Sequence, residues 1–193
     1  MDPLLLSEAL TKQFPTAVIA SHAYRGDATV TLRPEVLLEV ARFLKEDPAF
    51  QMSFLMDLTA VDYQTFGQKE KGAAFRNYGV PLAPPVQIPD GAPWPGPATK
   101  ARFEMVYHFF SVPHKHRMRL KVPVEELNPH VDSLVSLWAS ADWFEREVWD
   151  MFGIRFTGHP NLKRILMYEE FQGHPLRKDY PVNKRQPLIG PVN

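Results

Sequence analysis

The chain has 193 residues, of which 45% are hydrophobic, so it is long enough to form one globular domain with a sizeable core. The 22 Lys and Arg residues balance the 22 Asp and Glu residues, and this neutrality argues against a protein that binds nucleic acid mainly through counterion release. The absence of cysteine excludes a thiolate nucleophile, a cysteine-ligated zinc ion or iron–sulfur cluster, and any disulfide.

The first third of the chain has the pattern of a compact α+β unit. An apolar helix is expected over residues 4–14, and two β-prone runs at residues 17–21 and 28–32 predict a hairpin. Apolar residues at helical spacing follow Pro34 and predict a second helix that covers the sheet. Residues 50–63 then hold a further strand, whose acids Asp57 and Asp62 either end the strand or face a partner.

Residues 64–100 interrupt this pattern, because they contain seven Pro and five Gly and show little apolar periodicity. Such a long stretch without secondary structure is usually a functional loop, a binding arm or disordered. We therefore expect an inserted arm that is poorly ordered unless a partner covers it. Beyond the arm, residues 102–112 and 118–124 are β-rich and predict a second antiparallel hairpin.

Residues 133–152 give the strongest helical pattern. The predicted core stripe consists of Leu137, Ala141, Phe144, Val148 and Met151. Trp138, Trp143 and Trp149 flank that stripe, which indicates either an interface or coverage by loops of the same chain.

The acids of this helix do not form a catalytic pair. Glu145 and Glu147 point roughly 160° apart on a helical wheel, so they cannot converge on one substrate. Asp142, Arg146 and Asp150 have the spacing of an exposed salt-bridge ladder. A structural or docking role is therefore favoured over acid–base chemistry.

The histidines divide into two groups. His108, His114 and His116 lack accompanying acidic ligands, so the pattern disfavours a metal site. His159 and His174 each lie in a Gly-His-Pro tripeptide, which predicts a rigid corner where the imidazole bonds backbone or contacts a partner.

From residue 155 onward the chain is basic and turn-rich, which is typical of an extended tail lying on another protein; nucleic-acid binding is the competing interpretation. Arg177, Lys178 and Asp179 are its expected polar anchors. The expected apolar anchors are Leu162, Ile165, Leu166, Phe171, Leu176 and Tyr180. Because the helix and strands lie upstream, we expect a chain truncated after Phe152 to stay folded.

Residues 145–181, EREVWDMFGIRFTGHPNLKRILMYEEFQGHPLRKDYP, closely resemble the signature of the 30-kDa subunit, also called the C subunit, of the proton-pumping NADH:quinone oxidoreductase, respiratory complex I. Residues 55–63, 102–112, 118–124 and 136–150 resemble the same family. The Pro/Gly-rich arm departs from the shorter connection of the family, so the resemblance assigns it no role.

The resemblance implies an accessory core subunit of the peripheral arm, docked on the quinone-pocket subunit and near the iron–sulfur subunits. It implies no cofactor in this chain, FMN and iron–sulfur clusters in partner subunits, and no catalytic activity of the isolated chain. It also implies a place on the cytoplasmic side of the cell membrane, with membrane association only through the complex. Related subunits occur in membrane-bound hydrogenase-type complexes, which remain an alternative.

We therefore expect an α+β domain over residues 1–152, with a mixed sheet covered by helices, and an extended partner-binding tail over residues 153–193. Two rivals remain: a free-standing metal-dependent hydrolase that uses Glu147 or Asp150 with a histidine, and a small nucleic-acid-binding module. The expected partner-interface residues are Trp143, Glu145, Arg146, Glu147, Asp150, His159, Arg164, His174, Arg177, Lys178, Asp179 and Tyr180.

Overall fold

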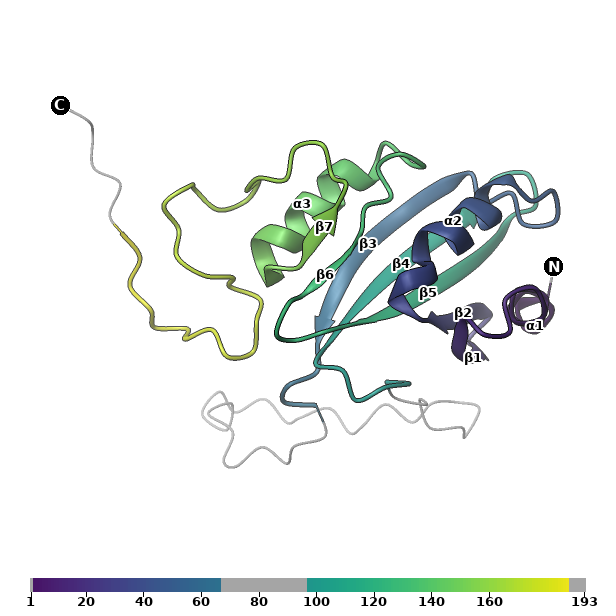
Figure 1. Cartoon of the computed structure of the whole chain (residues 1–193), viewed down its shortest axis with the longest axis horizontal. Helices are drawn as coiled ribbons and strands as arrows, with labels where there is room; N and C mark the ends of the chain where they lie inside the picture. Colours follow the sequence, from purple (N-terminus) through teal and green to yellow (C-terminus); the bar gives the residue numbers. More distant parts are fainter. Residues whose placement is uncertain (1, 67–96, 188–193) are drawn as a thin grey trace, which may run out of the picture.

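A computed structural model describes residues 2–66 and 97–187 of the chain (Figure 1). Most of the predicted arm, residues 67–96, lies outside the described residues. The helices are α1 (Pro3–Gln13), the 3₁₀ turn η1 (Pro34–Val36), α2 (Leu37–Glu46) and α3 (Ala141–Phe152). The strands are β1 (Val18–Tyr24), β2 (Asp27–Leu32), β3 (Phe54–Asp62), β4 (Phe103–Ser111), β5 (His116–Val124), β6 (His130–Asp132) and β7 (Arg155–Thr157).

Five strands form one mixed sheet in the order β1-β2-β5-β4-β3. The β2 and β5 strands run parallel, with Ala28 opposite Met118, whereas the other neighbours are antiparallel. Arg25 and Gly26 both have positive φ in the turn between β1 and β2, which matches the twist that a two-residue hairpin requires. The α+β class, the mixed sheet and both predicted hairpins are confirmed.

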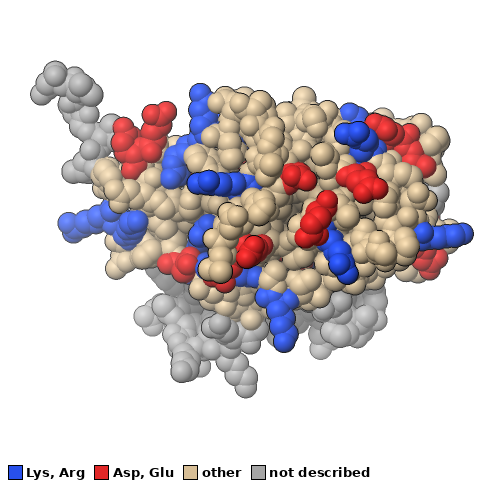
Figure 2. Space-filling view, viewed as in Figure 1, with Lys and Arg blue, Asp and Glu red and all other residues tan. Residues whose placement is uncertain are grey.

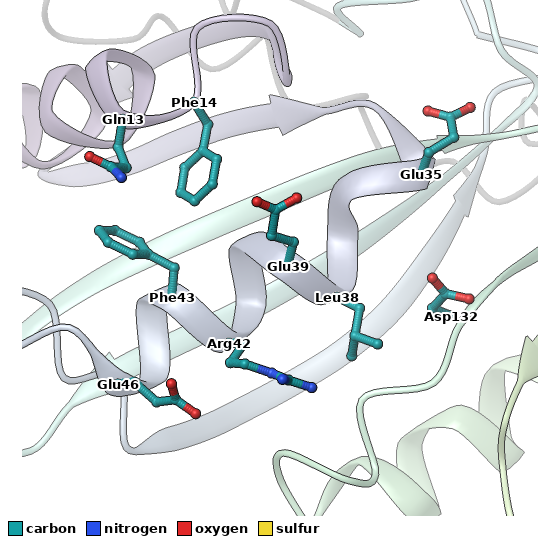
Figure 3. A pocket seen from close by; sticks show the side chains of 9 residues that line it. All are labelled: Gln13, Phe14, Glu35, Leu38, Glu39, Arg42, Phe43, Glu46 and Asp132. Carbon is teal, nitrogen blue, oxygen red and sulfur yellow. The ribbon is translucent and has the colours of Figure 1, made fainter.

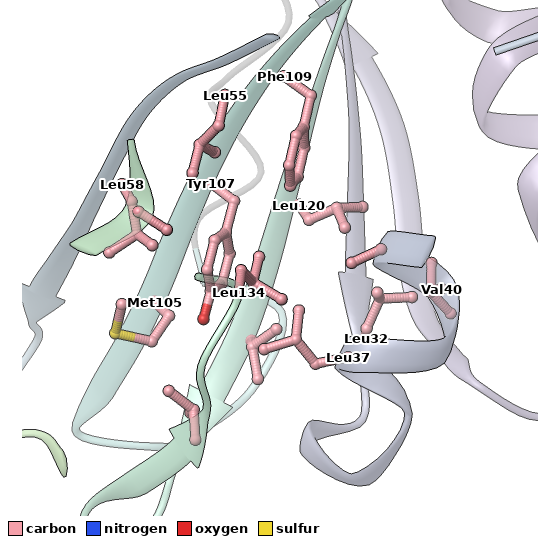
Figure 4. Close-up of a cluster of buried hydrophobic side chains, with 14 of the residues drawn as sticks. Leu32, Leu37, Val40, Leu55, Leu58, Met105, Tyr107, Phe109, Leu120 and Leu134 are labelled. Carbon is pink, nitrogen blue, oxygen red and sulfur yellow. The ribbon is translucent and has the colours of Figure 1, made fainter. Parts of the chain in front are cut away.

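The core lies between one face of the sheet and the helices. Along β4, Phe103, Met105, Tyr107 and Phe109 alternate toward this core and are buried, as the two-residue period of a strand requires. Figure 4 shows Met105, Tyr107 and Phe109 in this cluster. Leu10 of α1, Val40 of α2 and Val148 of α3 belong to the same buried cluster. All three helices therefore pack on one core, which fixes the position of α3 against the sheet.

The helix expected over residues 133–152 begins later, at Ala141. Residues 133–140 form turns instead, because the Ser133 N–H donates to the Thr157 carbonyl and the Leu134 carbonyl accepts from the N–H groups of Leu137 and Trp138. Leu134 and Trp138 of these turns are buried in the core. Apolar residues at helical spacing were thus buried without a helix, and the predicted start was wrong.

Candidate docking surface on α3 and the tail

The tail of the chain caps the C-terminus of α3. The last carbonyls of a helix have no partner within the helix. Here the Asp150 carbonyl lies 3.0 Å from His174 Nδ1, the Met151 carbonyl accepts from the Leu176 N–H at 3.1 Å, and the Phe152 carbonyl accepts from Arg177 Nε. Residues 174–177 therefore satisfy three consecutive carbonyls of α3.

Asp150 is fully buried and holds a second part of the tail. Its Oδ2 accepts from the N–H groups of Ile165, Leu166 and Met167 at 3.1, 2.9 and 2.8 Å, and its Oδ1 faces Arg164 Nη1. Burial acts to raise the pKa of Asp150, but these hydrogen bonds outweigh it and hold the pKa below the usual 3.8. A buried carboxylate thus folds the 164–167 loop onto the helix.

The salt-bridge ladder predicted on α3 is wrong. Arg146 does not pair with Asp150; its Nε and Nη2 donate to the carbonyls of Lys163 and Arg164 at 3.1 and 3.2 Å. Asp142 Oδ1 instead lies 3.1 Å from His159 Nε2. The tail supplies closer partners than the neighbouring turns of the helix, and spacing along the helix could not reveal them.

A third junction ties the tail to the end of the sheet. Arg102 Nη2 lies 3.0 Å from Asp62 Oδ2 and 2.8 Å from Asp179 Oδ1, and the Lys178 N–H donates to Asp62 Oδ2 at 2.8 Å. Burial acts to raise the pKa of Asp62, but the Arg102 and backbone hydrogen bonds lower it on balance. The Arg102 hydrogen bond likewise lowers the pKa of Asp179. Sequence reasoning named Asp62 only as a strand end or partner contact and missed Arg102.

Glu145 differs from Asp150 although both are fully buried. Its Oε1 accepts from the Leu134 N–H at 2.7 Å, while its Oε2 has no hydrogen-bond partner. Burial raises the pKa of Glu145 from 4.5 to about 7, because its hydrogen bonding only partly offsets the loss of hydration. Glu147 is exposed, so the two glutamates do not form a pair for acid–base chemistry.

The outer surface of α3 and the tail exposes large apolar side chains. Trp143 is 62% exposed, Leu166 56% and Leu176 49%. The Arg146 guanidinium lies 5.3 Å from the Trp143 ring centroid, and Tyr180 stacks on Phe171 with centroids 6.1 Å apart. Aromatic and Arg side chains on a backbone that the chain itself fixes are typical of an interface core.

The structure sorts the predicted interface residues by exposure. Trp143, Glu147 and Lys178 are exposed, and the Asp179 side chain is 48% exposed. Arg146, His159, Arg164, His174, Arg177 and Tyr180 are half-buried, whereas Glu145 and Asp150 are buried. Several of the polar anchors therefore bind the chain's own helix and sheet, and a partner contact at these residues stays a prediction.

Residues 2–66 and 97–187 contain no group of three His, Asp or Glu side chains arranged to hold a metal ion. His114 Nε2 and His116 Nε2 instead lie 2.9 and 3.0 Å from the carbonyls of Pro48 and Phe50. Within the same ranges, no helix has the length and apolar character needed to span a bilayer.

The fold and the surface together define an α+β protein whose tail is bound to its own last helix. The family described as "Respiratory-chain NADH dehydrogenase, 30 Kd subunit" matches residues 30–186, and the chain belongs to this family, the C subunits of complex I.

The relatives agree with this assignment. The C subunit of the NADH-quinone oxidoreductase of Roseiflexus sp. (strain RS-1) is 40% identical over 96% of this chain and 88% of its own length. That of Citrifermentans bemidjiense is 41% identical over 94% of this chain and 92% of its own. A trypsin-resistant fragment of Nqo5 superposes with a TM-score of 0.57 at 28% identity, covering 82% of this chain and 97% of the fragment. A chain of the membrane-bound sulfane sulfur reductase, an archaeal respiratory membrane complex, has a TM-score of 0.60, covering 93% of this chain and 86% of its own, but at 18% identity it shows the fold alone.

Proposed function

We propose that the chain is a cofactor-free accessory core subunit of the peripheral arm of the proton-pumping NADH:quinone oxidoreductase. In this proposal it docks on the quinone-pocket subunit, lies near the iron–sulfur subunits on the cytoplasmic side of the membrane, and supports electron transfer from NADH to quinone. Partner subunits supply FMN and the iron–sulfur clusters. Family membership supports the complex, and the exposed apolar side chains on α3 and the tail support the docking.

The geometry of the tail favours tight docking because its conformation is fixed before binding. Binding is weakened by the free energy needed to order flexible segments at an interface. Here Asp150, Asp62 and the carbonyls at the end of α3 already hold the tail backbone. The exposed side chains Trp143, Leu166 and Leu176 are thus presented on a preorganised surface, where a Trp is a frequent binding hot spot.

The docking proposal is tested by removing apolar contact without disturbing the core. In the variant Trp143→Ala, Leu166→Ser, Leu176→Ser, each replaced side chain is about half exposed or more, so the melting temperature of the free chain should change little. Loss of a central Trp contact costs at least about 2 kcal/mol, so binding to the quinone-pocket subunit should weaken about 30-fold or more. NADH:quinone activity of membranes should fall with the yield of assembled complex.

Leu127→Ser provides the matched control, because Leu127 is 92% exposed but lies between β5 and β6 rather than on α3 or the tail. It should leave assembly unchanged. Normal co-purification of the triple variant with the quinone-pocket subunit would show that docking uses another face of the chain.

A further inference from the structure

A separate groove of about 670 Å³ lies between the end of α1 and the outer face of α2. Its floor is the aromatic pair Phe14 and Phe43, and Leu38 lines the groove from another side of α2 (Figure 3); all three are half-buried. Phe14 and Phe43 point toward one another with ring centroids 5.2 Å apart in an edge-to-face arrangement (Figure 3). The aromatic floor continues to the buried Phe50, whose ring centroid lies 5.5 Å from that of Phe43. The floor is thus firmly packed from below and open above.

The rim of the groove is strongly acidic. Glu35, Glu39, Glu46 and Asp132 line it against a single cation, Arg42. Glu39, Arg42 and Glu46 share one side of α2, since their spacing of three and four residues places them within about 60° on the helix. Figure 2 shows several acidic side chains over this part of the molecule, with Lys and Arg side chains beside them. Among the described residues no ion pair involves any of these five side chains.

The local charge contrasts with the neutral chain as a whole and with the tail. The cations Arg164 and Arg177 of the tail are bound to Asp150 and to the Phe152 carbonyl, so they are not available to the groove. Nucleic acid and anionic lipid headgroups would both be repelled by the rim. A protein segment with Lys or Arg next to apolar side chains complements both the rim and the floor.

We infer that this groove binds a basic amphipathic segment of a neighbouring subunit. Apolar side chains of that segment pack on Phe14, Leu38 and Phe43, and its Lys or Arg side chains pair with Glu35, Glu39 and Glu46. The contact is distinct from the proposed docking through α3 and the tail, because the two surfaces share no residue. It gives the chain a second attachment site, which prefers a cationic partner, whereas the α3 and tail surface itself carries cations.

Charge reversal on α2 tests the inference in the whole complex. Glu39→Lys with Glu46→Lys should lower the yield of this subunit in the purified complex about tenfold or more, because like charges then face each other across the interface. Glu39→Gln with Glu46→Gln, which removes charge without reversing it, should give a smaller loss. Both glutamates are exposed, so the melting temperature of the free chain should stay near that of the parent.

Glu8→Lys and Glu125→Lys are matched controls, since both acids are exposed and neither lines the groove. They should leave the yield unchanged. A parent-like yield of the double Lys variant would overturn the inference, whatever the α3 and tail variants do.

A zero-length carboxyl-to-amine cross-linker applied to the native complex gives an independent readout. We expect Glu39 or Glu46 to be joined to a lysine in an apolar and basic stretch of another subunit. Cross-links from these glutamates only to this chain, or to a second copy of it, would contradict a neighbouring subunit as the occupant.

Discussion

Two acids five residues apart on α3 show that burial alone does not set the state of a carboxyl group. Glu145 and Asp150 are both fully buried, yet burial raises the pKa of Glu145 to about 7 while the pKa of Asp150 is lowered. The difference lies in the donors: Asp150 receives three backbone N–H groups and Arg164, whereas Glu145 receives the backbone N–H of Leu134 and no cation. Hydrogen bonds to the charged form decide the outcome.

Glu145 should make the free chain less stable as the pH rises. Between about pH 4.5 and 7 the carboxyl ionises in the unfolded chain but keeps its proton in the folded one, so the folded state binds more protons and stability falls by about 3 kcal/mol. Asp150 and Asp62 act in the opposite direction at lower pH, where stability is lost as the pH falls through their lowered pKa values.

Glu145→Gln should flatten this dependence, because the amide oxygen still accepts from Leu134 and carries no titrating proton. Urea unfolding of the parent and the variant at pH 5 and pH 7.5 measures the effect. Glu147→Gln, at an exposed position, should keep the parent's change in unfolding free energy between the two pH values. If the unfolding free energies of the parent and of Glu145→Gln changed equally between pH 5 and pH 7.5, the pH dependence would belong to another group.

At the scale of elements, alternation and turn residues were sufficient to predict the strands. Both hairpins follow from β-prone runs around short turns, and Gly153 with φ 74° ends α3 as a left-handed C-cap. The wrong start of α3 and the wrong ladder have one cause: distant residues decided both. The Ser133 N–H donates to the Thr157 carbonyl, and Asp150 accepts hydrogen bonds from the loop at residues 164–167 rather than pairing with Arg146.

Gly153 also lies close to the tail. A Cβ at this position would lie 2.5 Å from His174 Nε2 and 2.8 Å from Arg177 Nη2, so both tail residues would have to move. Gly158, with φ 83°, has open space around the corresponding position. Gly158→Ala should therefore cost only the backbone term of about 1 kcal/mol, whereas Gly153→Ala should cost about 2 to 4 kcal/mol.

Urea unfolding of the two glycine variants separates these contributions. Equal losses would show that the tail yields to the added methyl group without breaking its contacts with α3. A greater loss for Gly153→Ala, together with faster amide exchange of residues 174–177, is the expected result.

At the scale of the whole molecule, the chain presents two surfaces of different character around one hydrophobic core. The α3 and tail surface exposes apolar side chains and carries many cations, and the α2 groove is acidic. The boundary between domain and tail, expected after residue 152, is crossed by the parallel pairing of β7 with β6 and by the hydrogen bonds of Asp150 and Asp62. The sequence reveals the tail's composition but not these contacts, since each joins residues that are distant or lack a common period.

These contacts change what truncation should do. A chain ending after Phe152 was expected from the sequence to stay folded, but it would lose Arg164 and the three N–H donors of buried Asp150, and the strand that pairs with β6. Each hydrogen bond to a charged group contributes about 1.5 to 3 kcal/mol, so losing those of Asp150 removes a large share of the 5 to 15 kcal/mol that typically stabilises a domain. A chain ending after Pro181 keeps all of these contacts.

We therefore expect the longer truncation product to unfold in urea near the parent midpoint and the shorter one to unfold at much lower urea, with amide exchange of its α3 residues much faster than in the parent. A parent-like midpoint for the shorter chain would mean that the tail does not stabilise the domain and is held in place only by its partner.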